Sequence, residues 1–172
     1  LELGGKDATV IAEDADPEIA AKAVAYAALI NAGQVCTSTE RVYVPRRGAA
    51  KFTEAIVEHI KTLRLGSGLE STTDMGPMIG ETYRAKFETH IVDAKSRGAK
   101  ILVGGGRPTH LSRGFFHEPT VLTGVDHSMV IMRDETFGPA VPIMEYTTFD
   151  EAIKLTNDCQ YGLGAVLISN DA

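Results

Sequence analysis

The sequence predicts an α/β fold: a three-layer α/β/α sandwich with a largely parallel sheet. Short β-rich segments alternate with segments of ten residues or more in which apolar residues recur at helical spacing, a pattern typical of parallel strands joined by helices. The chain of 172 residues is long enough to bury one full core, and no change in composition marks an internal boundary. We therefore expect one domain over residues 1–172.

The first expected unit is a strand over residues 8–12 followed by a helix. Asp16-Pro17-Glu18 supplies an N-cap, a proline at the first helical position and an acid in the first turn. Gly33 is expected to end this helix. The residues expected to form its apolar stripe against the sheet are Ile19, Ala23, Ala27 and Ile30.

A strand over residues 41–44 and two further helices are expected next, separated by a glycine-rich loop over residues 66–80. The apolar face of the second helix comprises Phe52, Ile56, Ile60 and Leu63. That of the third comprises Tyr83, Phe87, Ile91 and Ala94. Gly98 closes the third helix.

The remaining elements are four strands and one helix. The strands are expected over residues 101–103, 120–122, 141–146 and 163–169. The helix begins at the capping box Thr148-Phe149-Asp150-Glu151 and ends near Asn157.

Composition narrows the classes of function. The net charge of −6 and the lack of a Lys/Arg run argue against a nucleic-acid partner. Two cysteines are too few for a disulfide framework, which favours a reducing compartment and a cytoplasmic location. The Ala-rich stretch over 19–30 contains Lys22 and is too short to span a membrane. The five histidines have no metal-ligand spacing, so no metal is expected.

The first candidate for chemistry is Cys36 in Gly33-Gln34-Val35-Cys36. A sharp bend after a helix end can present a thiol and its own N–H to one substrate atom. A lone cysteine is otherwise a small buried hydrophobe. On the residues alone, both interpretations of Cys36 stay open. Cys159 is expected to be buried and inert.

Two further strings carry carboxylates. Glu2-Leu3-Gly4-Gly5-Lys6 places an acid beside a flexible turn, although a lone Glu is usually a solvated charge. Lys6 is interpreted as structural or solvated. Glu135-Thr136-Phe137-Gly138-Pro139 places an acid and an aromatic ring beside Gly-Pro, which also occurs in ordinary turns.

Together and in this order, the three strings resemble the aldehyde dehydrogenase superfamily, and the resemblance runs through all 172 residues. It implies that Cys36 is the nucleophile and Glu2 the general base. It implies that Glu135 binds the hydroxyls of the nicotinamide ribose of NAD or NADP, and that Phe137 packs near the nicotinamide. The implied reaction oxidises a small aldehyde to a carboxylic acid through a thiohemiacetal and a thioester on the cysteine.

The resemblance covers the catalytic domain and leaves out nearly all of the nucleotide-binding domain and the C-terminal assembly strand of the superfamily. We therefore expect a fragment of a longer, homo-oligomeric parent that binds the cofactor mainly through the absent domain. The isolated fragment is expected to be inactive as a dehydrogenase.

The string from Cys36 to Val44 looks most like the branch that acts on lactaldehyde or glycolaldehyde. Asp134-Glu135-Thr136 stands where many members carry Glu-Glu-Ile. Two rival functions stay open: a stand-alone thiol esterase that uses Cys36 and Glu2, and an inactive interaction domain.

Overall fold

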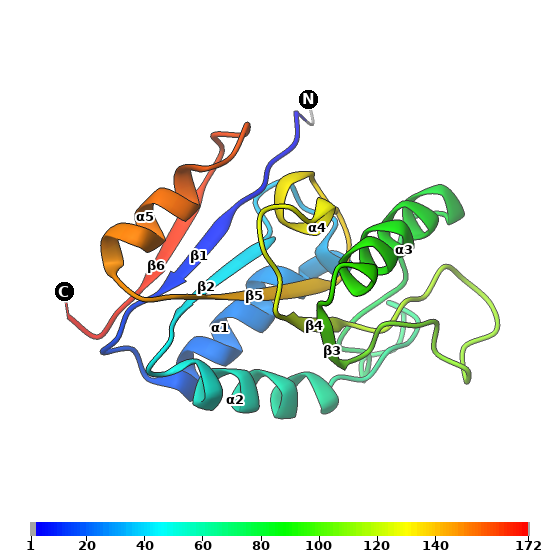
Figure 1. Ribbon diagram of the computed structural model, residues 1–172. Coiled ribbons are helices and arrows are strands. Elements are labelled where there is room, and N and C mark those ends of the chain that lie inside the picture. Colours follow the sequence, from blue (N-terminus) through cyan, green and yellow to red (C-terminus); the bar gives the residue numbers. More distant parts are fainter. Residues whose placement is uncertain (1–2, 172) are drawn as a thin grey trace.

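The computed structural model describes residues 3–171, which form one six-stranded mixed sheet with helices on both faces (Figure 1). The strand order is β3-β4-β5-β2-β1-β6. In Figure 1, α1 and α2 lie below the sheet, and α4 and α5 lie above it. The predicted three-layer fold is confirmed.

The sheet is parallel except at one edge. Its strands are β1 (Ala8–Ile11), β2 (Arg41–Pro45), β3 (Lys100–Val103), β4 (Thr120–Thr123), β5 (Ala140–Tyr146) and β6 (Ala165–Ile168). Only β3, paired with β4, runs antiparallel to its neighbour. Because β3 and β4 are antiparallel, the loop over residues 104–119 that joins them needs no helical crossover.

The helices are α1 (Pro17–Leu29), α2 (Ala49–Lys61), α3 (Glu81–Ser96), α4 (Val130–Arg133) and α5 (Phe149–Asn157), with a 3₁₀ turn over Ile30–Gly33. The predicted caps form: Asp16 accepts the N–H groups of Glu18 and Ile19, and Thr148 accepts that of Glu151. The single turn of α4 had no expected counterpart because it is too short to show a period.

The predicted buried face of α1 is wrong. Ile19 is 65% exposed and Ile30 is 41% exposed. The residues that are buried instead are Ala20, Ala21, Val24, Ala25, Ala28 and Leu29. Nearly every position of this helix is apolar, so periodicity does not distinguish its faces. Small alanines allow closer backbone approach than isoleucines, which favours their burial against the sheet and α2.

The other helices follow the expected pattern more closely. Phe52, Ile56 and Ile60 are buried on α2. On α3, Phe87, Ile91 and Ala94 are buried as expected, whereas Tyr83 is 48% exposed.

The amino ends of the central parallel strands lie side by side, along the side of the sheet where these strands begin. We call this side the amino-terminal edge of the sheet, as distinct from its outermost strands. Ala8 of β1 is in register with Arg41 of β2 and with Ala165 of β6, and Val42 of β2 is in register with Ile143 of β5. Because neighbouring parallel strands begin at the same edge, the segments that precede them also lie together. These segments contain the three strings identified in the sequence.

Candidate functional site

The segments that precede β1, β2 and β5 are in direct contact. The Gly5 N–H donates to Glu135 Oε1 at 3.0 Å. A Cβ at Gly5 would lie 2.3 Å from the carbonyl oxygen of Cys36, so only glycine allows this approach. The Gly-Gly turn therefore contacts both the thiol segment and the carboxylate loop.

The bend before Cys36 has an uncommon backbone. Asn31, Ala32 and Gly33 have φ values of 52°, 56° and 72°. Left-handed conformations cost non-glycine residues about 1–2 kcal/mol each, so surrounding contacts must hold them. Such contacts are present: Asn31 Nδ2 donates to the Gln34 carbonyl at 3.1 Å, and Gln34 Nε2 donates to the Asn31 carbonyl at 2.9 Å. Strain of this kind concentrates at functional sites.

The loop that carries Glu135 and Phe137 is also strained. Phe137 has a φ of 49°, and its half-buried ring lies 6.5 Å from that of Tyr83. A Cβ at Gly138 would lie 2.3 Å from a ring carbon of Phe87. A Cβ at Gly33 would lie equally close, 2.3 Å, to the Gly138 carbonyl oxygen. The close approach of the Gly33 and Gly138 backbones sets the distance between the loop and the thiol bend.

A buried polar cluster lies beneath this contact. Lys6 Nζ is 2.7 Å from Glu40 Oε2, with the two side chains 0% and 5% exposed. Lys6 also donates to Thr136 Oγ1 at 2.9 Å, and His90 Nδ1 lies 3.3 Å from the same hydroxyl. Burial lowers the pKa of the Lys6 ammonium, and the charge of Glu40 opposes that shift.

The structure brings three of the four predicted site residues together. Cys36, Glu135 and Phe137 are all half-buried in the joined segments. Glu2 lies outside the described residues. Lys6 is structural, and the solvated alternative is wrong.

Sequence reasoning missed Glu40, Thr136 and His90. Glu40 lies in a polar string next to Arg41, which on the sequence alone is typical of a solvated turn. The prediction that Cys159 is buried is wrong: it is half-buried, and the Tyr161 N–H lies 3.4 Å from its sulfur.

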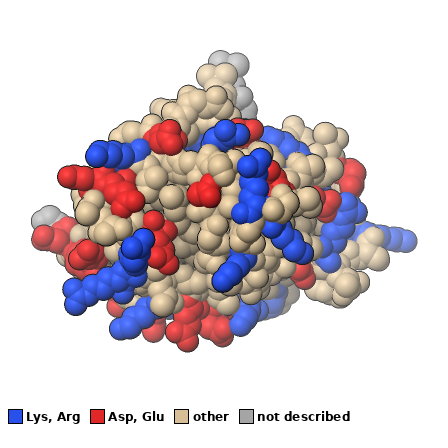
Figure 2. Space-filling model, viewed as in Figure 1, with Lys and Arg blue, Asp and Glu red and all other residues tan. Residues whose placement is uncertain are grey.

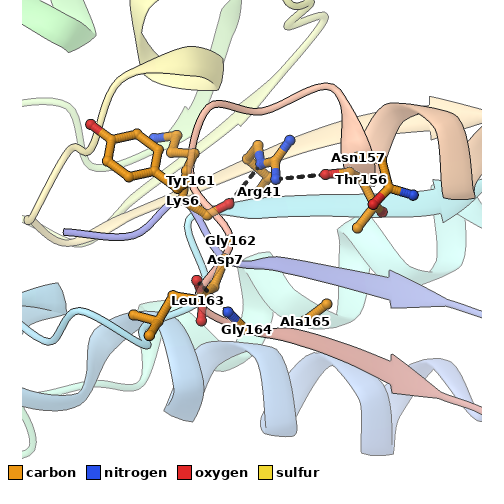
Figure 3. Close-up of a pocket in the computed structure, with 10 residues that line it drawn as sticks. All are labelled: Lys6, Asp7, Arg41, Thr156, Asn157, Tyr161, Gly162, Leu163, Gly164 and Ala165. Atoms are coloured by element: carbon orange, nitrogen blue, oxygen red, sulfur yellow. Dashed lines mark hydrogen bonds between the residues drawn. The ribbon is translucent and has the colours of Figure 1, made fainter. Parts of the chain in front are cut away.

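A pocket of about 320 Å³ lies beside the site at the same sheet edge (Figure 3). Arg41 borders it and joins β2 to the carboxyl end of α5. Its guanidinium donates to the carbonyls of Leu155 and Thr156 at 3.2 and 3.0 Å, and to that of Lys6 at 2.8 Å. The negative end of a helix dipole favours a cation there. Cys36 is not among the residues that line the pocket, so the pocket is separate from the thiol.

Three further observations concern surface charge, metal-ligating side chains and the length of the helices. On the face shown in Figure 2, acidic and basic side chains are interspersed. Within residues 3–171, no three His, Cys, Asp or Glu side chains gather as a metal site would require. No helix in that described range is long and apolar enough to cross a bilayer.

His90 predicts a pH dependence of stability. Burial, and secondarily the Lys6 charge, lowers the pKa of His90 from 6.5 to about 4. Between these two values the unfolded chain binds a proton that the folded chain does not. The contribution of neutral His90 to the free energy of unfolding is therefore complete above pH 6.5, and it decreases as the pH falls towards 4. Its slope is at most about 1.4 kcal/mol per pH unit.

Urea unfolding at several pH values measures this effect. We expect His90→Gln to flatten the decline between pH 6.5 and 4, whereas His110→Gln, at an exposed position, keeps the wild-type slope. Parallel curves for wild type and His90→Gln would contradict the prediction. Burial lowers the pKa of His117 in the same direction, so some decline should persist.

Two residues of the loop, Glu135 and Phe137, have side chains that could hold one end of a nicotinamide dinucleotide. Gly4 has a φ of 83°, and a Cβ there would lie 3.3 Å from both carboxylate oxygens of Glu135. A ring carbon of Tyr161 lies 3.2 Å from the same Cβ position, so the glycine backbone packs closely against Glu135, whose carboxylate is an acceptor suited to ribose hydroxyls. The half-buried ring of Phe137 lies on the same loop and offers a flat surface for an aromatic ring.

The sequence model described as "Aldehyde dehydrogenase family" matches residues 1–172. The peroxisomal aminoaldehyde dehydrogenase 2 of Malus domestica is 42% identical over 171 residues, which cover 99% of this chain and 34% of that protein. Betaine aldehyde dehydrogenase 1 of Oryza sativa subsp. japonica is 40% identical over the same shares.

Solved structures agree. Betaine aldehyde dehydrogenase from Staphylococcus aureus, in complex with NAD+, has a TM-score of 0.96 and 42% identity over 99% of this chain and 34% of that chain. Succinate-semialdehyde dehydrogenase from Burkholderia pseudomallei has a TM-score of 0.94 and 37% identity over 99% of this chain and 35% of that one. The chain thus spans about a third of the length of these relatives.

Proposed function

This chain belongs to the aldehyde dehydrogenase family, and on that premise we propose that it is the catalytic-thiol domain of an NAD(P)-dependent enzyme that oxidises an aldehyde to a carboxylic acid. The observation that supports this most strongly is the contact of the Gly4-Gly5 turn with both Cys36 and Glu135. It unites the thiol segment and the proposed cofactor loop at one edge of the sheet.

The proposed chemistry begins at the cysteine. The Cys36 thiolate attacks the aldehyde carbon and forms a thiohemiacetal whose oxygen carries the negative charge. Loss of hydride from that carbon converts the thiohemiacetal into a thioester. NAD(P)+, when bound, supplies the acceptor for this hydride. Glu2 then takes a proton from water, and the hydroxide formed hydrolyses the thioester and regenerates the thiol.

Glu135 and Phe137 orient the cofactor in this proposal. Glu135 accepts hydrogen bonds from the nicotinamide ribose hydroxyls, while its Oε1 also accepts the Gly5 N–H. Phe137 packs near the nicotinamide. These two residues reach only one end of a dinucleotide. The remaining contacts belong to a nucleotide-binding domain of a longer parent, in keeping with the chain spanning about a third of its relatives.

The substrate class is a small aldehyde. The names of the relatives support an aminoaldehyde or betaine aldehyde, which differs from the lactaldehyde or glycolaldehyde suggested by the string after Cys36. Homo-oligomerisation of the parent and a cytoplasmic location stay predictions. Relatives named above include a peroxisomal protein.

The test compares the full-length enzyme with the isolated chain. We expect the full-length enzyme to reduce NAD+ or NADP+ with at least one of these four aldehydes, and kcat/KM ranks them. The isolated chain should melt cooperatively by circular dichroism and produce no signal at 340 nm. A dinucleotide held at one end loses contacts needed to offset an association cost of about 4–15 kcal/mol.

The rival functions give different results. Hydrolysis of an activated ester by the isolated chain, lost in Cys36→Ser, would favour a thiol esterase. Thiol reactivity no greater than that of free cysteine, with no turnover by the full-length protein, would favour an interaction domain.

A further inference from the structure

One buried ion pair connects all three segments of the site. Lys6 directly follows the Gly4-Gly5 turn, and Glu40 lies four residues after Cys36 in the thiol segment. Their side chains meet at 2.7 Å with almost no exposure to solvent. The third segment contributes Thr136, which lies between Glu135 and Phe137 and accepts a hydrogen bond from Lys6 Nζ at 2.9 Å.

Glu40 also holds the backbone of the cofactor loop. Its Oε1 accepts the N–H groups of Thr136 and Phe137 at 3.1 and 2.7 Å. Its Oε2 accepts the Thr136 N–H at 2.8 Å, in addition to Lys6 Nζ. A charged acceptor makes hydrogen bonds about twice as strong as a neutral one. Phe137 is the residue with the left-handed backbone, a conformation that persists only where surrounding contacts impose it.

The function of this pair is geometric. A buried ion pair contributes little net stability compared with apolar side chains of the same volume, because both charges lose their hydration. Apolar residues could not accept hydrogen bonds from the N–H groups of Thr136 and Phe137, the first of which is buried. The pair thus sets the position of the loop relative to the bend that carries the thiol.

We propose that Lys6 and Glu40 are positioning residues, which act through Thr136 and the Phe137 backbone to hold the cofactor-binding side chains in register with the Cys36 thiol. This inference rests on the proposed function. In the proposed reaction, neither Lys6 nor Glu40 touches the reacting atoms. Their loss should therefore affect cofactor binding and loop order more than the reactivity of the thiol.

Glu40→Gln in the full-length enzyme is the principal test. The amide keeps the shape of the side chain, but its NH₂ group must face either Lys6 Nζ or a loop N–H, and both are donors. We expect KM for NAD(P)+ to rise at least tenfold, while the rate of Cys36 alkylation by iodoacetamide stays within twofold. In the protein without cofactor, hydrogen–deuterium exchange over residues 134–138 should accelerate at least tenfold.

Two further variants complete the test. Asp74→Asn removes an exposed ion pair with Arg64 of similar length, 2.9 Å, and should leave KM and exchange unchanged. The single variant Glu40→Gln leaves the buried Lys6 cation without its carboxylate partner. The double variant Lys6→Met/Glu40→Gln lacks this cation, so it keeps the test valid if the single variant misfolds. Its neutral acceptor should hold the loop less tightly, with KM raised at least threefold but less than in Glu40→Gln.

The outcomes separate the two proposals. An active wild-type enzyme together with a folded Glu40→Gln variant of unchanged KM and unchanged exchange would overturn the positioning role. So would an equal rise of KM in Asp74→Asn. If Glu40→Gln does not fold, an unchanged KM in the double variant overturns it. A wild-type enzyme that reduces no cofactor overturns the proposed function instead, and exchange over residues 134–138 still tests the ion pair.

Discussion

Replacing Cys36 by serine in the full-length enzyme should lower kcat/KM for aldehyde oxidation by about 10³-fold or more. A thiol with a pKa near 8.5 is about 3% ionised at pH 7, whereas a serine hydroxyl is essentially un-ionised. The substitution also removes the thioester, the intermediate that divides the oxidation into two easier steps. Steady-state formation of NADH or NADPH at 340 nm measures the loss.

Cys159→Ser is the matched control, because Cys159 is also half-buried but lies outside the joined segments. It should leave kcat/KM within about twofold, because Cys159 takes no part in the proposed chemistry. Iodoacetamide labelling with peptide mapping should modify Cys36 before Cys159. Preferential labelling of Cys159, or full activity in Cys36→Ser, would remove Cys36 from the proposed role.

Replacing Glu2 by glutamine should slow steady-state turnover by about 10²- to 10⁴-fold, the usual contribution of a general base. The amide cannot take a proton from water, so the thioester should accumulate. Hydride transfer precedes this step and should continue. Stopped-flow absorbance at 340 nm should therefore show a burst close to one equivalent per site, followed by a slow steady state.

Glu13→Gln, at an exposed position near the end of β1, is the control for charge and should keep both phases. An abolished burst with normal alkylation of Cys36 would give Glu2 a role before hydride transfer. A normal steady state would exclude it as the base. The role of Glu2 rests on its motif, and the described residues that follow it, Gly4 and Gly5, contact Glu135 and Cys36.

Short sequence patterns predicted the helix starts and the buried face of α2 well, because these features depend on residues that are close together in the chain. The N-caps at Asp16 and Thr148 form hydrogen bonds within three residues of the cap, so their outcome depends on nearby sequence alone. Phe52, Ile56 and Ile60 are the only large apolar residues on α2 apart from Val57, which made its buried face readable. The largely apolar α1 offered no such contrast, and its buried face was decided by packing.

The sequence by itself determined the family, the alternating elements and the three strings, which carry Glu2, Cys36, and Glu135 with Phe137, because each string is a short, contiguous pattern. The tertiary structure alone decided how these strings meet. Strand order places β1, β2 and β5 as neighbours, and parallel pairing brings the segments before them to one edge. The roles of Glu40 and Thr136 arise there, because their partners lie 34 to 130 residues away in the chain. No local pattern could encode a contact whose partner is supplied only by the packing of the sheet.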